Sequence, residues 1–148
     1  MKIKVAEYIA QFLVRHGMRD CFMVTGGGAM HLNDAIGHHN RIRCICNHHE
    51  QACAIAAEGY ARISGKIAAV CVTSGPGGIN TLTGVMGAWT DSIPMFLISG
   101  QAKRETCGSL YQDLHLRQLG DQEADLVRMV SGITKYAVML TDPAMTAY

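Results

Sequence analysis

The chain has 148 residues, of which 49% are hydrophobic and 17% charged, and its formal net charge at pH 7 is +1. This length and composition favour a single domain (residues 1–148) with a packed core over a disordered chain. A net charge this close to zero gives no attraction to nucleic acid or to an anionic membrane, and no apolar run approaches the roughly 18 residues of a membrane span.

The amino-terminal part of the chain predicts two helices with a strand between them. Residues 4–16 carry apolar side chains at helical spacing, with polar residues interrupting the apolar face. We therefore predict an amphipathic helix rather than a secretion signal, which favours the cytoplasm as the compartment. Residues 21–24 predict the first strand, and residues 30–38 predict the second helix.

A glycine-rich loop, Thr25-Gly26-Gly27-Gly28, joins this strand to the second helix. Glycines without side chains let the backbone of such a loop approach a ligand closely. A dinucleotide fingerprint would need a third, correctly spaced glycine, which is missing here. An ordinary strand-to-helix turn is equally compatible with each glycine taken alone.

A second strand, residues 43–46, leads into a helix that carries Glu50 near its start. The segment Asn47-His48-His49-Glu50 has the form of a capping box, with Asn47 as the N-cap and Glu50 bonding back to it. On spacing alone, this capping role is the favoured interpretation of Glu50. His48 and His49 are more typical of solvated or capping side chains than of catalytic ones. The alanines and glycines that follow indicate either tight packing on a sheet or a contact with another subunit.

A third strand, residues 68–73, is apolar throughout, as expected of a strand that is covered on both faces. The turn Ser74-Gly75-Pro76-Gly77-Gly78 follows it and leads into a helix over residues 79–89. Such a turn at a helix start is a general anion site, but no Gly-Lys-Ser/Thr follows, which argues against a nucleotide P-loop. Residues 95–99 predict the fourth strand.

The last third of the chain has a weaker pattern. Residues 103–120 mix charged and polar residues and predict a long loop. Residues 126–131 predict a short helix, residues 133–140 a last strand, and a final helix starts at Asp142. The alternation of strands and helices along the chain predicts an α/β fold, a doubly wound, mainly parallel sheet with helices on both faces.

The six cysteines contain no C-x-x-C pair. Cys44, Cys46 and His48 alternate along a predicted strand, so they share one face of it. A zinc site on this face would have unusual ligand spacing. Buried, reduced thiols that pack as small hydrophobic groups are the favoured interpretation.

Two long motifs, HHEQACAIAAEGYARISGK and VTSGPGGINTLTGVMGAWTDSIPMFLISGQ, follow one another in the middle of the chain. Together they resemble the amino-terminal pyrimidine-binding (PYR) domain of thiamine-diphosphate enzymes, and in particular the acetolactate synthase group. The resemblance extends weakly over nearly the whole chain and implies the thiamine-diphosphate-binding fold.

This resemblance also implies roles for individual residues. It implies that Glu50 faces N1′ of the cofactor's aminopyrimidine ring and helps to move the proton that activates the thiazolium C2. A carboxyl group in an apolar pocket suits this role, because burial penalises its charged form and lets it share a proton with a ring nitrogen. The other residues implied to line the cofactor site are Gly27, Gly28, Thr73, Pro76, Asn80 and Gln122.

The activity implied is that of a lyase or transferase acting on a small 2-oxo acid. Family enzymes usually carry a tyrosine-proline pair where Thr25 and Gly26 stand, and an aromatic residue where Asp121 stands. No substrate is therefore carried over from acetolactate synthase itself. The alternatives are the PYR subunit of a split 2-oxo acid decarboxylase and a non-catalytic binding domain of the same fold.

Enzymes of this family bind Mg²⁺ and the cofactor's diphosphate on a separate domain marked by Gly-Asp-Gly. The one Gly-Asp pair of this chain, Gly120-Asp121, has no glycine after it. The resemblance therefore implies a fragment of a longer enzyme, or half of a split one, that is inactive alone. It also implies a homodimer or larger oligomer, in which the diphosphate-binding domain of a neighbouring subunit completes the site.

Overall fold

The computed structural model describes residues 2–147 and contains one four-stranded parallel sheet within them. The strand order is β2-β1-β3-β4, and each neighbouring pair is parallel. The strands are β1 (Asp20–Met23), β2 (Arg43–Cys46), β3 (Ala69–Val72) and β4 (Phe96–Ser99). This confirms the predicted α/β class, and each of the four predicted strands lies within one or two residues of its observed bounds.

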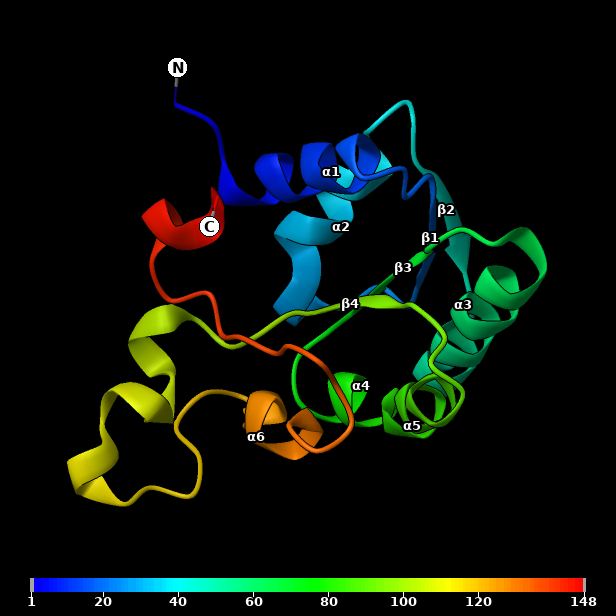
Figure 1. Ribbon diagram of the computed structural model, residues 1–148. Coiled ribbons are helices and arrows are strands. Elements are labelled where there is room, and N and C mark those ends of the chain that lie inside the picture. Colours follow the sequence, from blue (N-terminus) through cyan, green and yellow to red (C-terminus); the bar gives the residue numbers. More distant parts are fainter. Residues whose placement is uncertain (1, 148) are drawn as a thin grey trace.

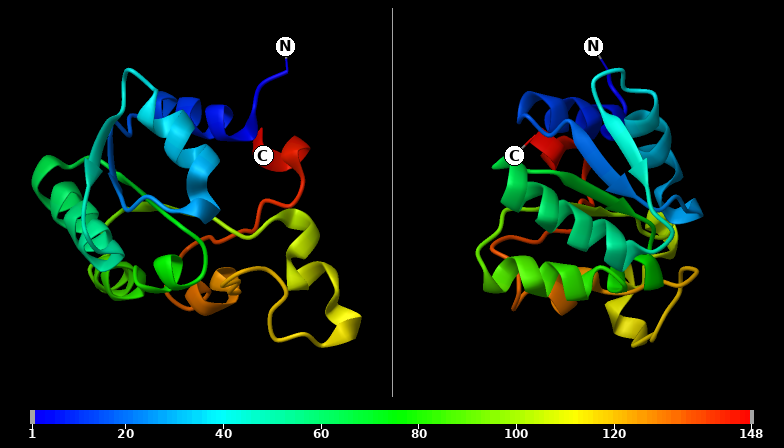
Figure 2. Two further views of the ribbon diagram at one scale, coloured as in Figure 1. Left: turned by 180° about the vertical axis from the view of Figure 1, so that it is seen from behind. Right: turned by 90° about the vertical axis from the view of Figure 1, so that its right-hand side faces the viewer.

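Successive strand residues point to opposite sides of the sheet, so both faces carry apolar side chains. Helices cover both faces (Figures 1 and 2). On one face, α1 (Val5–Arg15) and α2 (Met30–Gly37) pack through Leu13 and Ile36 against strand residues such as Cys21. On the other face, α3 (Glu50–Ser64) packs through Cys53 and Ala57 against Phe22, Val70 and Val72. The right-hand view of Figure 2 shows these layers from the side.

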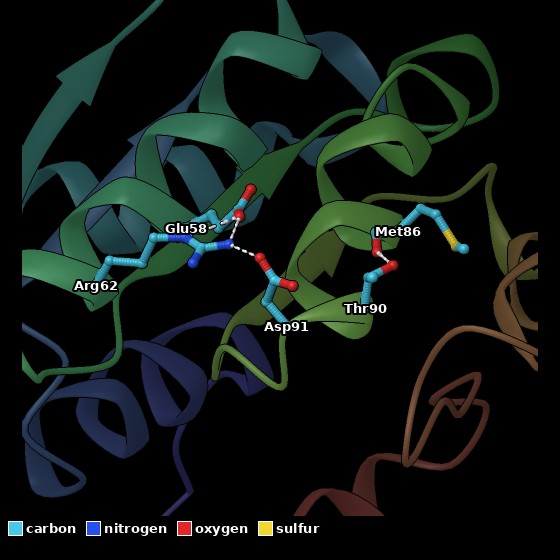
Figure 3. A network of polar contacts seen from close by, with 5 residues as sticks. All are labelled: Glu58, Arg62, Met86, Thr90 and Asp91. Atoms are coloured by element: carbon cyan, nitrogen blue, oxygen red, sulfur yellow. Dashed lines mark hydrogen bonds and ion pairs between the residues drawn. The ribbon is translucent and has the colours of Figure 1, made fainter.

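The small residues of α3 bring it into close contact with α5 (Leu82–Thr90). A Cβ atom placed on Gly84 of α5 would lie 2.9 Å from the backbone nitrogen of Ile55, so only glycine fits there. Arg62 of α3 bonds to Glu58 on its own helix and to Asp91 at the end of α5 (Figure 3). In the same view, the Thr90 hydroxyl donates to the carbonyl of Met86 at 2.9 Å. The small residues of α3 therefore serve, at least in part, to pack α5 against α3 within this chain.

The structure corrects several predicted elements. The helix expected over residues 79–89 is two helices, α4 (Pro76–Ile79) and α5, and the strand expected over residues 133–140 is not formed. Residues 103–120 contain three short 3-10 helices rather than a plain loop, and the final helix is also of the 3-10 type. The remaining elements are η1 (Gly27–Ala29), η2 (Arg104–Thr106), η3 (Gly108–Leu110), η4 (Gln112–Leu114), α6 (Leu126–Val130) and η5 (Pro143–Ala147).

Figure 1 shows that the segment after β4 leaves the sheet and extends to one side before the chain returns. Its last element, η5, contacts α1. Among residues 2–147, no helix combines the length and the apolar composition that crossing a membrane requires.

Candidate functional site

The predicted site residues before residue 100 come from loops that follow the carboxyl ends of parallel strands. In the order β2-β1-β3-β4, the chain continues from β1 to β2 on one side and from β3 to β4 on the other. The loops after β1 and β3 therefore diverge at a switch point, where open α/β sheets characteristically bind ligands. Glu50 follows β2, which pairs with β1 on the far side from β3.

The start of α3 differs from the predicted capping box. The N-cap is His49, whose Nδ1 accepts a hydrogen bond from the backbone N–H of Gln51 at 3.1 Å. Asn47 lies two residues before this N-cap, and its side-chain amide donates to the sulfur of Cys53 at 3.4 Å. Glu50 is the first residue of the helix, so the prediction that Asn47 caps α3 with Glu50 three residues into the helix is wrong. The His49 ring accepts from a backbone N–H group in the first turn of the helix, whereas the Glu50 carboxylate makes a tertiary contact with Asn80.

Glu50 meets the glycine turn that follows β3. The side-chain amide of Asn80 donates to Glu50 Oε2 at 2.9 Å, across thirty residues of sequence. A Cβ atom placed on Gly77 would lie 3.3 Å from Glu50 Oε1 and 2.6 Å from Thr73 Cγ2. Gly77 therefore lets its backbone lie close to Thr73 and to the carboxylate, and a larger residue does not fit there. Three predicted residues, Glu50, Thr73 and Asn80, thus surround one small cradle, while Pro76 begins α4 beside it and is exposed.

The Glu50 side chain is not enclosed in an apolar pocket by the described residues. Glu50 is half-buried, and the hydrogen bond between its carboxylate and the Asn80 amide is exposed to solvent. The sequence-based expectation of an apolar environment is therefore not met within residues 2–147, since the groups nearest the carboxylate are an amide and a glycine.

The loop after β1 contacts the same turn. The backbone N–H of Gly28 donates to Thr73 Oγ1 at 3.1 Å, so this predicted residue does reach the site. Gly27 is exposed, and nothing lies within 4 Å of where its Cβ would be. Gly26, which sequence reasoning did not select, is the closer neighbour, because a Cβ there would lie 2.7 Å from Thr73 Oγ1.

Gln122 approaches the glycine turn through its backbone. Its carbonyl oxygen lies directly against the α-carbon of Gly75, which has a φ of 52° and leaves no room for a side chain. Gln122 also has a positive φ, 51°, and its side chain is exposed. Hydrogen bonds hold this segment in place: the Gln101 amide donates to the carbonyl of Ala124 at 3.1 Å, and Glu123 accepts from the N–H of Gly108 at 2.7 Å.

The cysteines are all free thiols. Four are buried, Cys44 is half-buried and Cys46 is exposed, so the expectation of buried thiols fails for Cys46. Burial raises the pKa of the Cys71 thiol to about 12, which keeps it protonated and unreactive at neutral pH. Residues 2–147 contain no group of three or more His, Cys, Asp or Glu side chains that could hold a metal ion.

Two further residues shape the site without having been predicted. Gly77 lets its backbone lie close to Thr73 and Glu50, and the Ser99 hydroxyl at the end of β4 donates to the carbonyl of Thr73 at 3.0 Å. The sequence did carry a signal for Gly77, because a glycine-rich turn directly follows a buried strand. Nothing in the local sequence distinguishes Ser99, because its role depends on β4 lying next to β3.

The sequence matches one family model and several known relatives. The family model described as thiamine pyrophosphate enzyme, N-terminal TPP binding domain, matches residues 3–129. The acetolactate synthase large subunit of Haemophilus influenzae is 44% identical over 108 residues, covering 73% of this chain and 19% of the relative.

Two more relatives align over most of the chain. The acetolactate synthase large subunit of Lactococcus lactis is 36% identical over 139 residues, covering 94% of this chain and 23% of that protein. The chloroplastic acetolactate synthase of Arabidopsis thaliana is 35% identical over 139 residues, covering 94% of this chain and 19% of that protein. The chain thus spans about a fifth of the length of these relatives. The cradle of Glu50, Thr73 and Gly77 lies within the matched residues, and the chain belongs to the family of thiamine pyrophosphate enzymes through their N-terminal TPP-binding domain.

Proposed function

We propose that this chain is the pyrimidine-binding part of a thiamine-diphosphate-dependent lyase or transferase of the acetolactate synthase type, acting on a small 2-oxo acid. The observation that carries the proposal is the Glu50 carboxylate at the start of α3, held by Asn80 beside the backbone of Gly77. Membership of the thiamine pyrophosphate enzyme family supports the same assignment.

The residues of the cradle fit the pyrimidine half of the cofactor. An aminopyrimidine is flat, and the absence of a side chain at Gly77 keeps Glu50 Oε1 uncrowded, because a Cβ atom there would lie 3.3 Å from it. The ring nitrogen of an aminopyrimidine accepts a hydrogen bond, and a carboxyl group can both donate a proton to it and take one back. The residues that would line this part of the site are Gly26, Gly28, Glu50, Thr73, Pro76, Asn80 and Gln122.

In the mechanism that follows, Glu50 holds or releases a proton at the ring nitrogen while α3 keeps the carboxylate in place. When bound, the cofactor would supply a carbon nucleophile for the 2-oxo acid. Thr73 in the loop after β3 and the backbone of Gly28 in the loop after β1 would orient the ring, and the Gln122 backbone closes the glycine turn. A proton relay of this kind contributes about 10²- to 10⁴-fold to a rate.

We further propose that the diphosphate and Mg²⁺ are bound by a different domain, supplied by a neighbouring subunit of a homodimer or larger oligomer. The chain spans about a fifth of the length of its relatives, which leaves room for such a domain. Apolar side chains of α3 and α5, among them Ile55, Ile63, Met86 and Trp89, are exposed, and Ile63 is 91% exposed. A surface of this kind favours a protein partner. The chain alone would then bind the cofactor weakly and be inactive.

The test is the Glu50→Gln variant of the full-length protein, assayed for carbon dioxide release from a panel of 2-oxo acids with saturating cofactor and Mg²⁺. Gln keeps the size of Glu but cannot exchange the proton, so we expect turnover to fall by about 10²- to 10⁴-fold. Glu58→Gln is the matched control, because Glu58 lies two turns along the same helix and pairs with Arg62.

Each alternative predicts a different result. Undiminished turnover in Glu50→Gln would refute the proton-relay role. A full-length protein that binds thiamine diphosphate but turns over no 2-oxo acid would favour the non-catalytic binding domain. Activity that appears only after a second gene product is added would favour the split 2-oxo acid decarboxylase.

A further inference from the structure

The two oxygens of the Glu50 carboxylate have different surroundings. Oε2 accepts a hydrogen bond from the Asn80 side-chain amide at 2.9 Å. Oε1 points toward Gly77, where a Cβ atom would approach it to 3.3 Å. One oxygen is therefore held by a side-chain donor, and the other lies beside the backbone of Gly77, where no side chain crowds it.

The chemistry of the amide makes this difference functional. If the Asn80 oxygen faced Glu50, it would repel the carboxylate, so the donating NH₂ group is the one in contact. An oxygen that accepts from an N–H group is stabilised as the charged oxygen. A proton that arrives at the carboxyl group therefore resides preferentially on Oε1.

Asn80 is itself held in a fixed position. Its backbone N–H donates to the carbonyl of Pro76 at 2.9 Å and ends α4. The next residue, Thr81, is 1% exposed and donates from its hydroxyl to the carbonyl of Gly78 at 2.6 Å. The Asn80 amide is thus attached to a buried, hydrogen-bonded turn rather than to a free loop.

We propose that Asn80 is a positioning residue that assigns the two Glu50 oxygens different roles, with Oε2 anchored and Oε1 exchanging the proton with the ring nitrogen. Gly77 takes part by leaving Oε1 reachable. This inference rests on the proposed function and adds to it which oxygen reacts and what fixes it.

The experiment compares two variants of the full-length protein, Asn80→Leu and Asn80→Gln. Leu has a similar size but no donor, so the carboxylate loses its anchor. We expect kcat to fall about 10- to 100-fold with the KM for the 2-oxo acid unchanged, because misplacement by about 1 Å can cost about 100-fold in rate. Gln keeps the donor on a longer side chain, and it should recover part of the lost rate. Asn40→Leu is the control, because Asn40 is exposed and lies before β2, at the amino ends of the strands, whereas the site lies at their carboxyl ends.

A second measurement does not depend on activity. Crystal structures of the cofactor-free protein should show Glu50 in one rotamer in the unchanged protein and in several rotamers in Asn80→Leu. Thermal unfolding checks that Asn80→Leu is folded; a variant that did not fold would leave Asn80→Gln and its Glu50 rotamer to decide the question.

The results separate the two levels of the proposal. If Glu50→Gln is inactive while Asn80→Leu keeps its kcat and an ordered Glu50, the positioning role is overturned and the proposed function stands. If Glu50→Gln is fully active, the proposed function fails, and the proton-exchange role of Oε1 fails with it. Loss of kcat with a disordered Glu50 in Asn80→Leu, and partial recovery in Asn80→Gln, supports the positioning role.

Discussion

The sheet region, residues 5–99, and the segment that follows it, residues 101–147, owe their order to different interactions. Every residue of β3 is buried, and apolar clusters fill both faces of the sheet. In the segment after the sheet, Cys107 is the one hydrophobic residue among the described ones that is fully buried, and residues 110–119 are exposed throughout. Apolar burial stabilises the first region, whereas the second depends on a few polar anchors.

Those anchors are grouped around Glu123. Its carboxylate accepts from the backbone N–H groups of Gly108 at 2.7 Å and of Gly120 at 3.2 Å. Asp125 caps α6 by accepting from the N–H of Arg128 at 3.0 Å. Since Gln122 directly precedes Glu123, its approach to the glycine turn is set by hydrogen bonds rather than by a core.

The largest expected difference between the regions is seen by removing a leucine from each. Leu13 is fully buried between α1 and the sheet, and Leu114 is 63% exposed. We expect Leu13→Ala to lower the free energy of unfolding by about 2–5 kcal/mol, because it leaves a cavity. Leu114→Ala should change it by less than about 0.5 kcal/mol. Urea unfolding followed by circular dichroism measures both, and similar losses in the two variants would contradict the comparison.

The same contrast explains which elements the sequence predicted. Each strand of the sheet contains a short apolar run followed by polar or glycine residues, and such runs predict parallel strands from local information alone. The two central strands, β1 and β3, are buried throughout. Residues 133–140 end in a continuous apolar run, residues 136–140, yet Tyr136 is 77% exposed and no strand pairs with this segment. An apolar run is a local signal, whereas forming a strand requires a neighbour that local sequence does not specify.

The residues of the candidate site could be predicted from the sequence, but the contacts between them could not. Glu50, Thr73 and Asn80 were identified through the family motifs, and the parallel sheet brings the loops after β2 and β3 near one another. The hydrogen bond between Glu50 and Asn80 joins residues thirty positions apart, so no spacing rule could have predicted it. The cap of α3 was mispredicted because Asn is the commoner N-cap residue, while here the His49 ring occupies that place.

A smaller effect is expected from adding one methyl group to each region. In Gly84→Ala, the new Cβ would lie 2.9 Å from the backbone of α3, so α5 has to shift, and we expect a loss of about 1–3 kcal/mol. Gly132 has no atom within 4 Å of its Cβ position, so Gly132→Ala should be neutral or slightly stabilising. Thermal unfolding of the two variants gives the comparison. A stable Gly84→Ala protein would mean that the contact between α3 and α5 is looser than described.

The smallest effect concerns the anchor of the second region. Burial by itself would raise the pKa of the Glu123 carboxyl, but hydrogen bonds from the backbone N–H groups of Gly108, Gly120, Leu119 and Ser109 outweigh it and lower the pKa below its ordinary value of 4.5. Because the folded pKa is the lower one, the stabilisation from Glu123 is fully present above pH 4.5 and is lost as the pH falls through the folded pKa.

Glu123→Gln should reproduce this loss at neutral pH, because a neutral amide is a weaker acceptor than a carboxylate. We expect hydrogen exchange at the amides of Gly108 and Gly120 to become about 5- to 10-fold faster, as the loss of a modest hydrogen bond implies. Glu105→Gln is the control, since Glu105 is exposed in the same segment. The amide of Val70 in β3 should keep its protection in both variants. If Val70 lost protection together with Gly108, the segment after the sheet would open only with the core, and polar anchoring could not be what orders it.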